Sequence, residues 1–347
     1  MVTLFLQASP SPGPGEMPFF PFPPVAALVG GIGVVIGALI VLLLTAVYVA
    51  ILYWADRYEK EPASVLAAAL LGGAIAAPVL TVVVERLAGI RMSVYPAAFH
   101  ALNAAFFGPN PAGAVVEEGM KALVILVLFR ALPREFDGVL DGVVYGGVVG
   151  AGFALAESAV YLWDLSRLGT AAAPGVGMFF GILVTGLTHC AFGAIFGAFL
   201  GAVREFGLSG SGSWWLPVGG FGVAALYHAA YDALAALLAS GTGPVGLVGL
   251  ARTAADWAGV AALVITVAWA LRHERSVMSR YLPLEAQEGH VPREYVDAVL
   301  QGRWSSLPRP VRQPLAELAF ARRRLERGLT NEAELQLYRD RIREVAR

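Results

Sequence analysis

The sequence predicts an all-α membrane protein, in which a bundle of about seven transmembrane helices precedes a soluble helical tail. Of its 347 residues, 57% are hydrophobic and only 15% are charged, and the mean hydropathy is +0.65. These values are far from those of a soluble globular domain. Uncharged stretches also recur at the length that a transmembrane helix needs, about 20 residues. A lipid bilayer is therefore the expected environment, and the net charge of -1 argues against nucleic-acid binding.

The composition divides the chain into three parts. Residues 1–24 are rich in proline and glycine and are expected to be a disordered lead-in. Residues 25–271 hold the apolar stretches, and residues 272–347 are rich in arginine with a helical charge pattern, as expected of a cytoplasmic helical tail. The only cysteine, Cys190, excludes an internal disulfide and a cysteine metal cluster.

Seven stretches are apolar enough to predict transmembrane helices. They are residues 25–54, 64–84, 112–132, 138–163, 176–203, 214–238 and 246–271. The first two are joined by a short charged connection, Asp56 to Pro62, whose proline suits the first turn of a helix. Residues 85–111 are interrupted by charges and prolines, and we expect an interfacial or re-entrant segment there.

Basic residues predict the orientation of the bundle. Connections that would share one side carry more arginine and lysine than those on the other side, and the arginine-rich tail lies on the richer side. Cytoplasmic connections are enriched in these residues. The sequence thus predicts an outside N-terminus and a cytoplasmic C-terminus.

The third predicted span contains Glu117, Glu118 and Lys121. A charged side chain near the middle of a bilayer costs about 2.5–3.5 kcal/mol, so these three need partners or a function. Lys121 follows the two glutamates at four and three residues, which places all three on one side of a helix. An ion pair uses only one glutamate, and the other is available for chemistry.

The next three spans carry further polar residues at a similar predicted depth. Glu157 is in the fourth span, His189 in the fifth, and His228 and Asp232 stand one turn apart in the sixth. Glycines recur every fourth residue from Gly138 and again after His189, a pattern that lets two helices approach closely. We expect all these polar side chains to meet in one pocket.

Carboxylates and imidazoles both bind divalent metals and move protons near neutral pH. Two glutamates, a third glutamate and two histidines on four helices could hold a divalent metal such as zinc with an open position for water. Without a metal, a glutamate and a histidine could activate water directly. Both routes lead to hydrolysis inside a membrane.

Several short motifs, in order, resemble the PrsW family of intramembrane proteases. They are Asp56-Arg57-Tyr58-Glu59-Lys60-Glu61-Pro62, Glu117-Glu118-x-x-Lys121, Phe136-Asp137 to Asp141-Gly142 with Tyr145-Gly146, Gly152-Phe153-Ala154-x-x-Glu157, His189, and His228-x-x-x-Asp232. That family is related to the prenyl-protein (CAAX) and bacteriocin-processing proteases. The resemblance implies a multi-pass protein of the bacterial inner membrane that cleaves a membrane-anchored protein, such as an anti-sigma factor.

The resemblance also implies roles for the polar residues. Glu117 would be the catalytic base, and Glu118 and Lys121 would position it. Glu157, His189 and His228 would complete the site as metal ligands, with Asp232 as a secondary candidate. Glu157 stands where the prenyl-protein branch has histidine, which argues against a CAAX substrate.

Other interpretations of the same residues stay open. The buried carboxylates and histidines could form the relay of an ion-coupled transporter, although no internal repeat is evident. They could also merely fix helix pairing in a non-catalytic scaffold. Asp137 and Asp141 are expected near the cytoplasmic interface, and Arg252 with Asp256 is expected to be a structural pair.

Overall fold

A computed structural model describes residues 23–88, 111–167, 176–208, 213–240 and 244–346. Within these ranges the regular structure is helical throughout, which confirms the predicted all-α class. Nearly all of the predicted lead-in, and residues 89–110 of the predicted re-entrant segment, lie outside the described residues.

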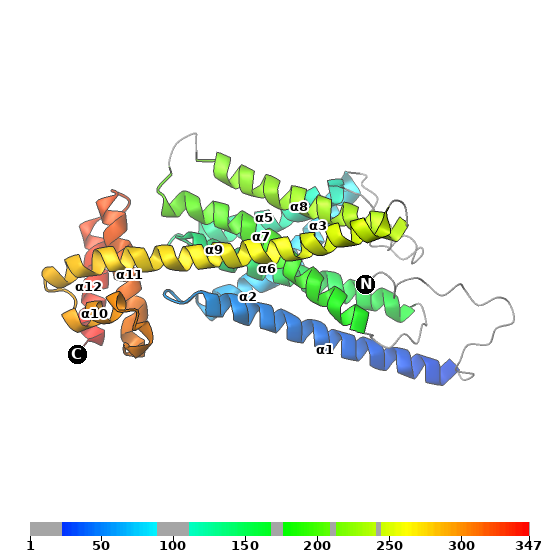
Figure 1. Cartoon of the computed structure of the whole chain (residues 1–347), viewed down its shortest axis with the longest axis horizontal. Helices are drawn as coiled ribbons and strands as arrows, with labels where there is room; N and C mark the ends of the chain where they lie inside the picture. Colours follow the sequence, from blue (N-terminus) through cyan, green and yellow to red (C-terminus); the bar gives the residue numbers. More distant parts are fainter. Residues whose placement is uncertain (1–22, 89–110, 168–175, 209–212, 241–243, 347) are drawn as a thin grey trace.

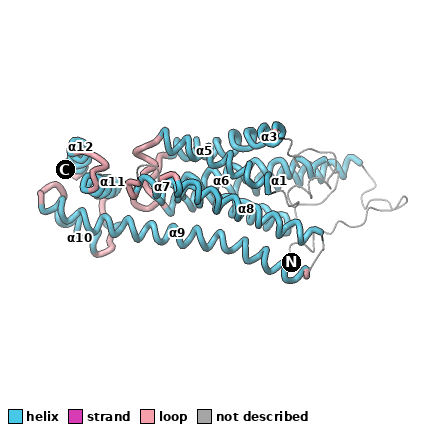
Figure 2. Tube along the Cα trace, turned by 90° about the horizontal axis from the view of Figure 1, so that it is seen from above, coloured by secondary structure: helices cyan, strands magenta, loops and turns pink. Residues whose placement is uncertain are grey.

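Long, roughly parallel helices form most of the bundle, and the C-terminal helices gather at one of its ends (Figures 1 and 2). The bundle consists of α1 (Pro23–Ala55), α2 (Ala63–Leu71), the π-helical turn η2 (Gly72–Ala76), α3 (Ala77–Leu87), α5 (Pro111–Ala131), α6 (Val139–Arg167), α7 (Val176–Glu205), α8 (Trp215–Ser240) and α9 (Val245–Gln287). These C-terminal helices, together called the C-terminal domain, are α10 (Arg293–Leu300), η3 (Trp304–Ser306), α11 (Arg309–Glu326) and α12 (Glu332–Val345).

Five stretches of the described helices are long and apolar enough to cross a membrane. They are Val34–Ala55, Ala63–Leu87, Val139–Val160, Gly186–Glu205 and Gly246–Gln287. The other two predicted spans correspond to α5 and α8, which are not among these five stretches. Both helices pack within the same bundle, α5 on α3 and α8, and α8 also on α7. The structure is thus consistent with a polytopic helical bundle.

The centre of the bundle is α6, and its position follows from its glycines. Almost all of its span is buried, and it packs on α1, α2 and α7. A Cβ atom added at Gly146 would lie 2.1 Å from the carbonyl oxygen of Gly193 on α7, and one at Gly142 would lie 2.0 Å from that of Gly197. Only glycine permits this approach, so the predicted small-residue contact is confirmed. It extends to Gly150, where an added Cβ would lie 2.0 Å from the carbonyl oxygen of His189.

Arg204, near the end of α7, fixes the last turn of α5. Its guanidinium donates hydrogen bonds to the backbone carbonyl oxygens of Phe129 at 2.8 Å and of Phe136 at 2.5 Å. It also lies 3.8 Å from the centre of the Phe129 ring. Carbonyl groups at the end of a helix have no partner within the helix, so a partly buried arginine that donates hydrogen bonds to them stabilises the helix end. α5 is thereby tied to α7 at the end opposite Glu117.

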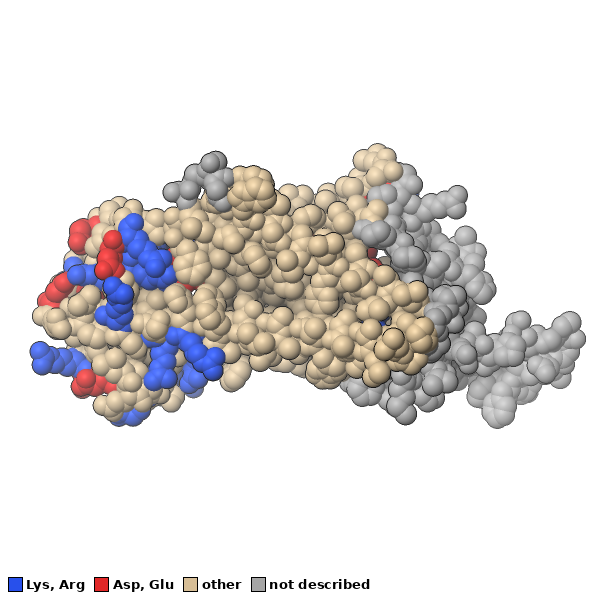
Figure 3. Space-filling model, turned by 45° about the horizontal axis from the view of Figure 1, so that its top comes forward, with Lys and Arg blue, Asp and Glu red and all other residues tan. Residues whose placement is uncertain are grey.

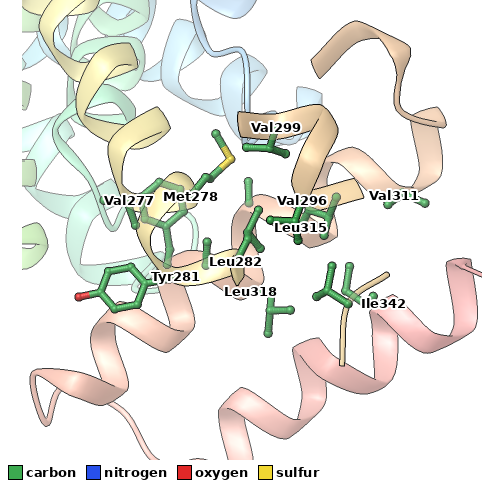
Figure 4. Close-up of a cluster of buried hydrophobic side chains, with 14 of the residues drawn as sticks. Val277, Met278, Tyr281, Leu282, Val296, Val299, Val311, Leu315, Leu318 and Ile342 are labelled. Carbon is green, nitrogen blue, oxygen red and sulfur yellow. The ribbon is translucent and has the colours of Figure 1, made fainter. Parts of the chain in front are cut away.

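The C-terminal helices form their own hydrophobic core, and α9 enters it without a break at residue 272, where the sequence analysis placed the tail (Figure 4). Met278 and Leu282 of α9 are fully buried among Leu315 and Leu318 of α11 and Ile342 of α12. In Figure 3 the basic and acidic side chains gather over this end of the molecule, and the visible bundle is largely uncharged. This contrast fits a helical tail outside the lipid.

Two arginines of α11 join this C-terminal domain to the bundle. Arg323 donates a hydrogen bond to Glu205, at the end of α7, at 3.0 Å. Arg324 bonds to the carboxylate of Asp137, in the connection between α5 and α6. Asp141 accepts hydrogen bonds from the backbone N–H groups of Asp137 and Gly138, as expected of a residue that caps the start of a helix.

The glycine contact yields a direct prediction. Replacing Gly146 by alanine inserts a methyl group against the backbone of α7, and such overpacking costs about 1–3 kcal/mol. We expect Gly146→Ala to lower the unfolding temperature of the purified full-length protein in mild detergent. The matched control is Gly219→Ala on α8, where an added Cβ meets nothing within 4 Å. Equal unfolding temperatures for Gly146→Ala and the wild type would contradict the packing described here.

Candidate active site

Lys121 of α5 is the most deeply buried charged residue of the predicted site. Its exposed fraction is 0%, and Glu118, one turn earlier, is 3% exposed. The Lys121 ammonium donates a hydrogen bond to Oε1 of Glu118. Both glutamates were suitable partners by spacing, and the structure pairs the lysine with Glu118. Glu117 is left outside this ion pair.

The same ammonium connects α5 to α7. Nζ of Lys121 lies 3.0 Å from Nδ1 of His189. It also lies 4.5 Å from the centre of the Phe153 ring, on α6. Because the ammonium can only donate, Nδ1 of His189 must accept, and the proton of a neutral His189 is on Nε2. A carboxylate, an imidazole and an aromatic face together replace the water that this cation has lost.

Glu118 connects α5 to α8 in the same way. Its Oε1 atom, which accepts from Lys121, also lies 2.7 Å from Nδ1 of His228. Nδ1 must therefore carry the proton, and the other nitrogen, Nε2, faces away from Glu118. A carboxylate behind one ring nitrogen fixes the orientation of an imidazole and directs the opposite nitrogen toward a ligand or a reacting group.

The side of His228 opposite Glu118 is the more open part of the site. Nε2 of His228 lies 3.5 Å from Asp232 and 3.8 Å from Glu117, both too far for a good hydrogen bond. The side chains of Glu117 and Asp232 are 27% and 20% exposed, whereas that of His228 is 6% exposed. Two carboxylates thus converge on one imidazole nitrogen where the site is accessible.

Glu157 of α6 completes the network. Its Oε2 atom lies 2.7 Å from Nε2 of His189. This oxygen is buried but has no hydrogen bond of good geometry within the part of the chain that the structure describes. All seven residues that the sequence singled out, Glu117, Glu118, Lys121, Glu157, His189, His228 and Asp232, therefore meet in one network built by α5, α6, α7 and α8.

Phe192 is a residue of this site that the sequence analysis missed. Its ring stacks on His228, with 4.7 Å between ring centres and 18° between the planes, and its edge meets the ring of His189. Phe192 is 1% exposed and packs against both imidazoles, whose own rings meet edge to face with 5.3 Å between their centres. Its position one helical turn after His189 was the signal that could have revealed it.

The remaining polar pairs lie elsewhere in the fold. Arg252 is 3.4 Å from Asp256, as predicted, and its guanidinium lies 3.4 Å from the centre of the Tyr231 ring. This contact ties α9 to α8 beside Asp232. Asp137 and Asp141 belong to the end of the bundle where the C-terminal domain packs.

One group of potential metal ligands in the described residues has its ligand atoms within 4.8 Å of one another, and it is Glu285, Glu288 and His290. It was not among the predicted ligands. Arg322 and Arg339 already form ion pairs with both of its glutamates. This group therefore has its charges balanced within the C-terminal domain and is a structural network.

Comparisons with known proteins agree with the order of these motifs. Residues 61–271 match the model of a family described as "PrsW family intramembrane metalloprotease". Over 114 residues the chain is 32% identical to "Protease PrsW" of Clostridioides difficile (strain 630), which covers 32% of this chain and 44% of that relative. The chain thus matches less than half the length of this curated relative, and no solved structure matches significantly. The matched family region contains every residue of the network, and the chain belongs to the PrsW family of intramembrane metalloproteases.

Proposed function

We propose that this protein is an intramembrane endopeptidase that hydrolyses a peptide bond of a membrane-anchored protein. The observation that carries the proposal is the contrast between the two neighbouring glutamates. Glu118 is buried and bound to Lys121 and His228, whereas Glu117 is 27% exposed and has no such commitment. A hydrolase needs one carboxylate that can reach water and a fixed environment around it, and this arrangement offers both.

In this proposal Glu117 is the general base. Its carboxylate takes a proton from the attacking water and returns it to the amine that leaves when the peptide bond breaks. Glu118 and Lys121 act through position, because their ion pair holds the first turns of α5 against His189 and His228. Asp232, 3.5 Å from Nε2 of His228, is placed to orient that imidazole or to share its charge.

In chemical type the residues of the site fit a divalent metal such as zinc, but in this structure the ligand atoms of Glu157, His189 and His228 do not all lie within 4.8 Å of one another. We assign Glu157, His189 and His228 as its ligands, because imidazole nitrogens and carboxylate oxygens are the ligands that zinc prefers. Two observations support the fit. The first is that Nε2 of His228 faces two carboxylates but forms no good hydrogen bond with either. The second is that Oε2 of Glu157 lies 2.7 Å from Nε2 of His189 but has no hydrogen bond of good geometry among the described residues. A bound metal would polarise the peptide carbonyl and make water more acidic.

The proposed substrate is a protein with a single transmembrane helix, such as an anti-sigma factor. The site lies within the apolar bundle, so a substrate must present its peptide bond from the lipid. The proposed orientation places the N-terminus outside and the C-terminal domain in the cytoplasm of a bacterial cell. The arginines at the C-terminal end support this orientation through the positive-inside rule.

The role of Glu117 can be tested by cleavage in reconstituted vesicles. We expect Glu117→Gln to slow the cleavage of single-span membrane proteins by about 10²–10⁴-fold, because glutamine cannot accept the proton from water. Its folded yield should equal that of the wild type. The matched control is Glu85→Gln, a change at a glutamate of α3 that is also buried in the bundle, at 6% exposure, but lies outside the network. Cleavage by Glu117→Gln at the wild-type rate would refute the assigned base.

Metal content tests the ligand assignment separately from activity. We expect about one divalent ion per chain in protein purified without chelator, and loss of this ion in His228→Gln and Glu157→Gln. The measurement is elemental analysis by mass spectrometry of the full-length protein. His290→Gln is the control, since His290 belongs to the other potential ligand group, in the C-terminal domain. If both site variants keep the ion and His290→Gln loses it, the metal is bound by Glu285, Glu288 and His290 instead.

A further inference from the structure

A polar cavity lies at the other end of the bundle, away from the site. Its volume is about 290 Å³, and it is enclosed by the connection between α1 and α2, the connection between α5 and α6, and helices α11 and α12. Seven carboxylates and four basic side chains line it. Three residues of the charged motif at 56–62, which the proposed chemistry does not use, are part of the lining: Glu59, Lys60 and Glu61.

The basic side chains of this cavity are largely committed to other groups. Arg324 is bound to Asp137, and Arg341 lies 2.6 Å from Glu317. Lys60 donates to the backbone carbonyl of Tyr53 and lies over the Tyr53 ring. Arg134 is the one basic lining residue with no hydrogen bond or ion pair among the described residues. The lining therefore holds more carboxyl groups than basic side chains.

The carboxylates fall into two groups. Glu61 accepts from the hydroxyl of Tyr145, and Asp141 accepts from two backbone N–H groups, so both are part of the fold. Glu59 and Glu135 line the cavity and form no hydrogen bond or salt bridge with any described residue. These two are available to a ligand, and changing them removes no hydrogen bond or salt bridge with a described residue.

The electrostatic environment also favours a positively charged ligand. Burial raises the pKa of Glu59 well above the ordinary value for a glutamate, and the charges of Asp137 and Asp141 raise it further. Burial, with the charge of Asp141, raises the pKa of Glu61 to about 11. Oε2 of Glu274, on α9, is a further buried carboxylate oxygen without a hydrogen bond among the described residues, and it experiences the charges of Asp141 and Asp56. The raised pKa values leave the carboxyl groups of Glu59 and Glu61 protonated near neutral pH, and a cation bound beside them would favour their ionised form.

We propose that this cavity binds the basic segment that follows the transmembrane helix of a substrate protein, with Glu59 and Glu135 holding its lysine or arginine side chains. This inference rests on the proposed function and orientation. Membrane proteins carry lysine and arginine directly on the cytoplasmic side of their spans, so a single-span substrate presents such a segment at this end of the bundle.

The distance between site and cavity fits such a substrate. From Glu118 to the end of α5 at Ala131 is roughly 20 Å of helix, and the cavity begins just beyond, at Arg134 and Glu135. The apolar core of a bilayer is about 30 Å thick. A helical substrate whose basic segment occupies the cavity would place the residue about 13 positions earlier at the level of Glu117. The cavity would thus select where the substrate is cut.

Binding of a fluorescent hexalysine peptide to the full-length protein in neutral detergent tests this proposal. Since each partly exposed ion pair is weak, we expect the double variant Glu59→Gln, Glu135→Gln to weaken binding by about tenfold. The matched control is the double variant Glu294→Gln, Glu344→Gln, which removes two exposed glutamates outside the cavity and should bind as the wild type does. Equal affinity for the two double variants, or tighter binding of a hexaglutamate peptide, would overturn the proposal.

A cleavage experiment separates this proposal from the proposed function. Replacing the basic segment of a cleaved single-span protein by glutamines should raise KM for the wild type and have little effect in Glu59→Gln, Glu135→Gln. If charged and uncharged substrates are cut equally well by the wild type, the cavity has no such role, although the protease remains. If no membrane protein is cut but the Glu117→Gln variant still binds hexalysine through Glu59 and Glu135, the binding site remains and the protease does not.

Discussion

The candidate active site depends on how one lysine is neutralised inside an apolar bundle. A charged ammonium out of contact with water is tolerated only when nearby groups replace its hydration. Lys121 receives that replacement from Glu118 on its own helix and from His189 on α7, and Glu118 in turn holds His228 of α8. The need to satisfy one buried charge thereby fixes three helices relative to one another. Glu117 takes no part in the ion pair with Lys121 because Glu118 already supplies the negative charge.

The glycine contact between α6 and α7 fixes the position of His189 along the bundle. The backbones of the two helices touch at Gly146 and Gly193, and the same contact places the carbonyl group of His189 against Gly150. His189 therefore cannot shift along α6 without a clash of backbones. Glu157, two turns beyond Gly150, reaches Nε2 of His189 as a result. Helix packing and site geometry thus follow from the same four-residue repeat.

The two ends of the bundle have different tasks in this account. Toward one end the polar side chains are few, mostly buried and connected to each other. At the other end the C-terminal domain packs through Arg323 and Arg324, and a cavity with an excess of carboxylates remains beside Glu59. This division suits an enzyme that must hold a substrate outside the lipid while it acts on a bond within it. In the proposed cavity, the charged connection after α1 also contributes to substrate binding.

Much of this arrangement follows from spacing in the sequence, and the remainder depends on three-dimensional packing. Polar residues within apolar stretches indicated the whole network, because burial leaves them few alternatives, and the repeat from Gly138 indicated the α6–α7 contact. The choice of Glu118 over Glu117 as the partner of Lys121 could not be predicted, since three- and four-residue spacings both permit an ion pair. Phe192 was missed because a phenylalanine in an apolar helix carries no signal of its own. The pairing of Arg324 with Asp137 joins residues far apart in the chain, which no local pattern reports.

The central claim is that Lys121 and Glu118 stabilise the bundle only as a pair. A double-mutant cycle in the purified protein, with unfolding free energies measured for Lys121→Leu, Glu118→Leu and the combined variant, tests it most directly. Removing either partner alone leaves a buried charge without its counterpart, so each single variant should lose about 3–5 kcal/mol. The combined variant should recover most of that loss. Single variants as stable as the wild type, or losses that simply add, would show that this ion pair does not hold the site together.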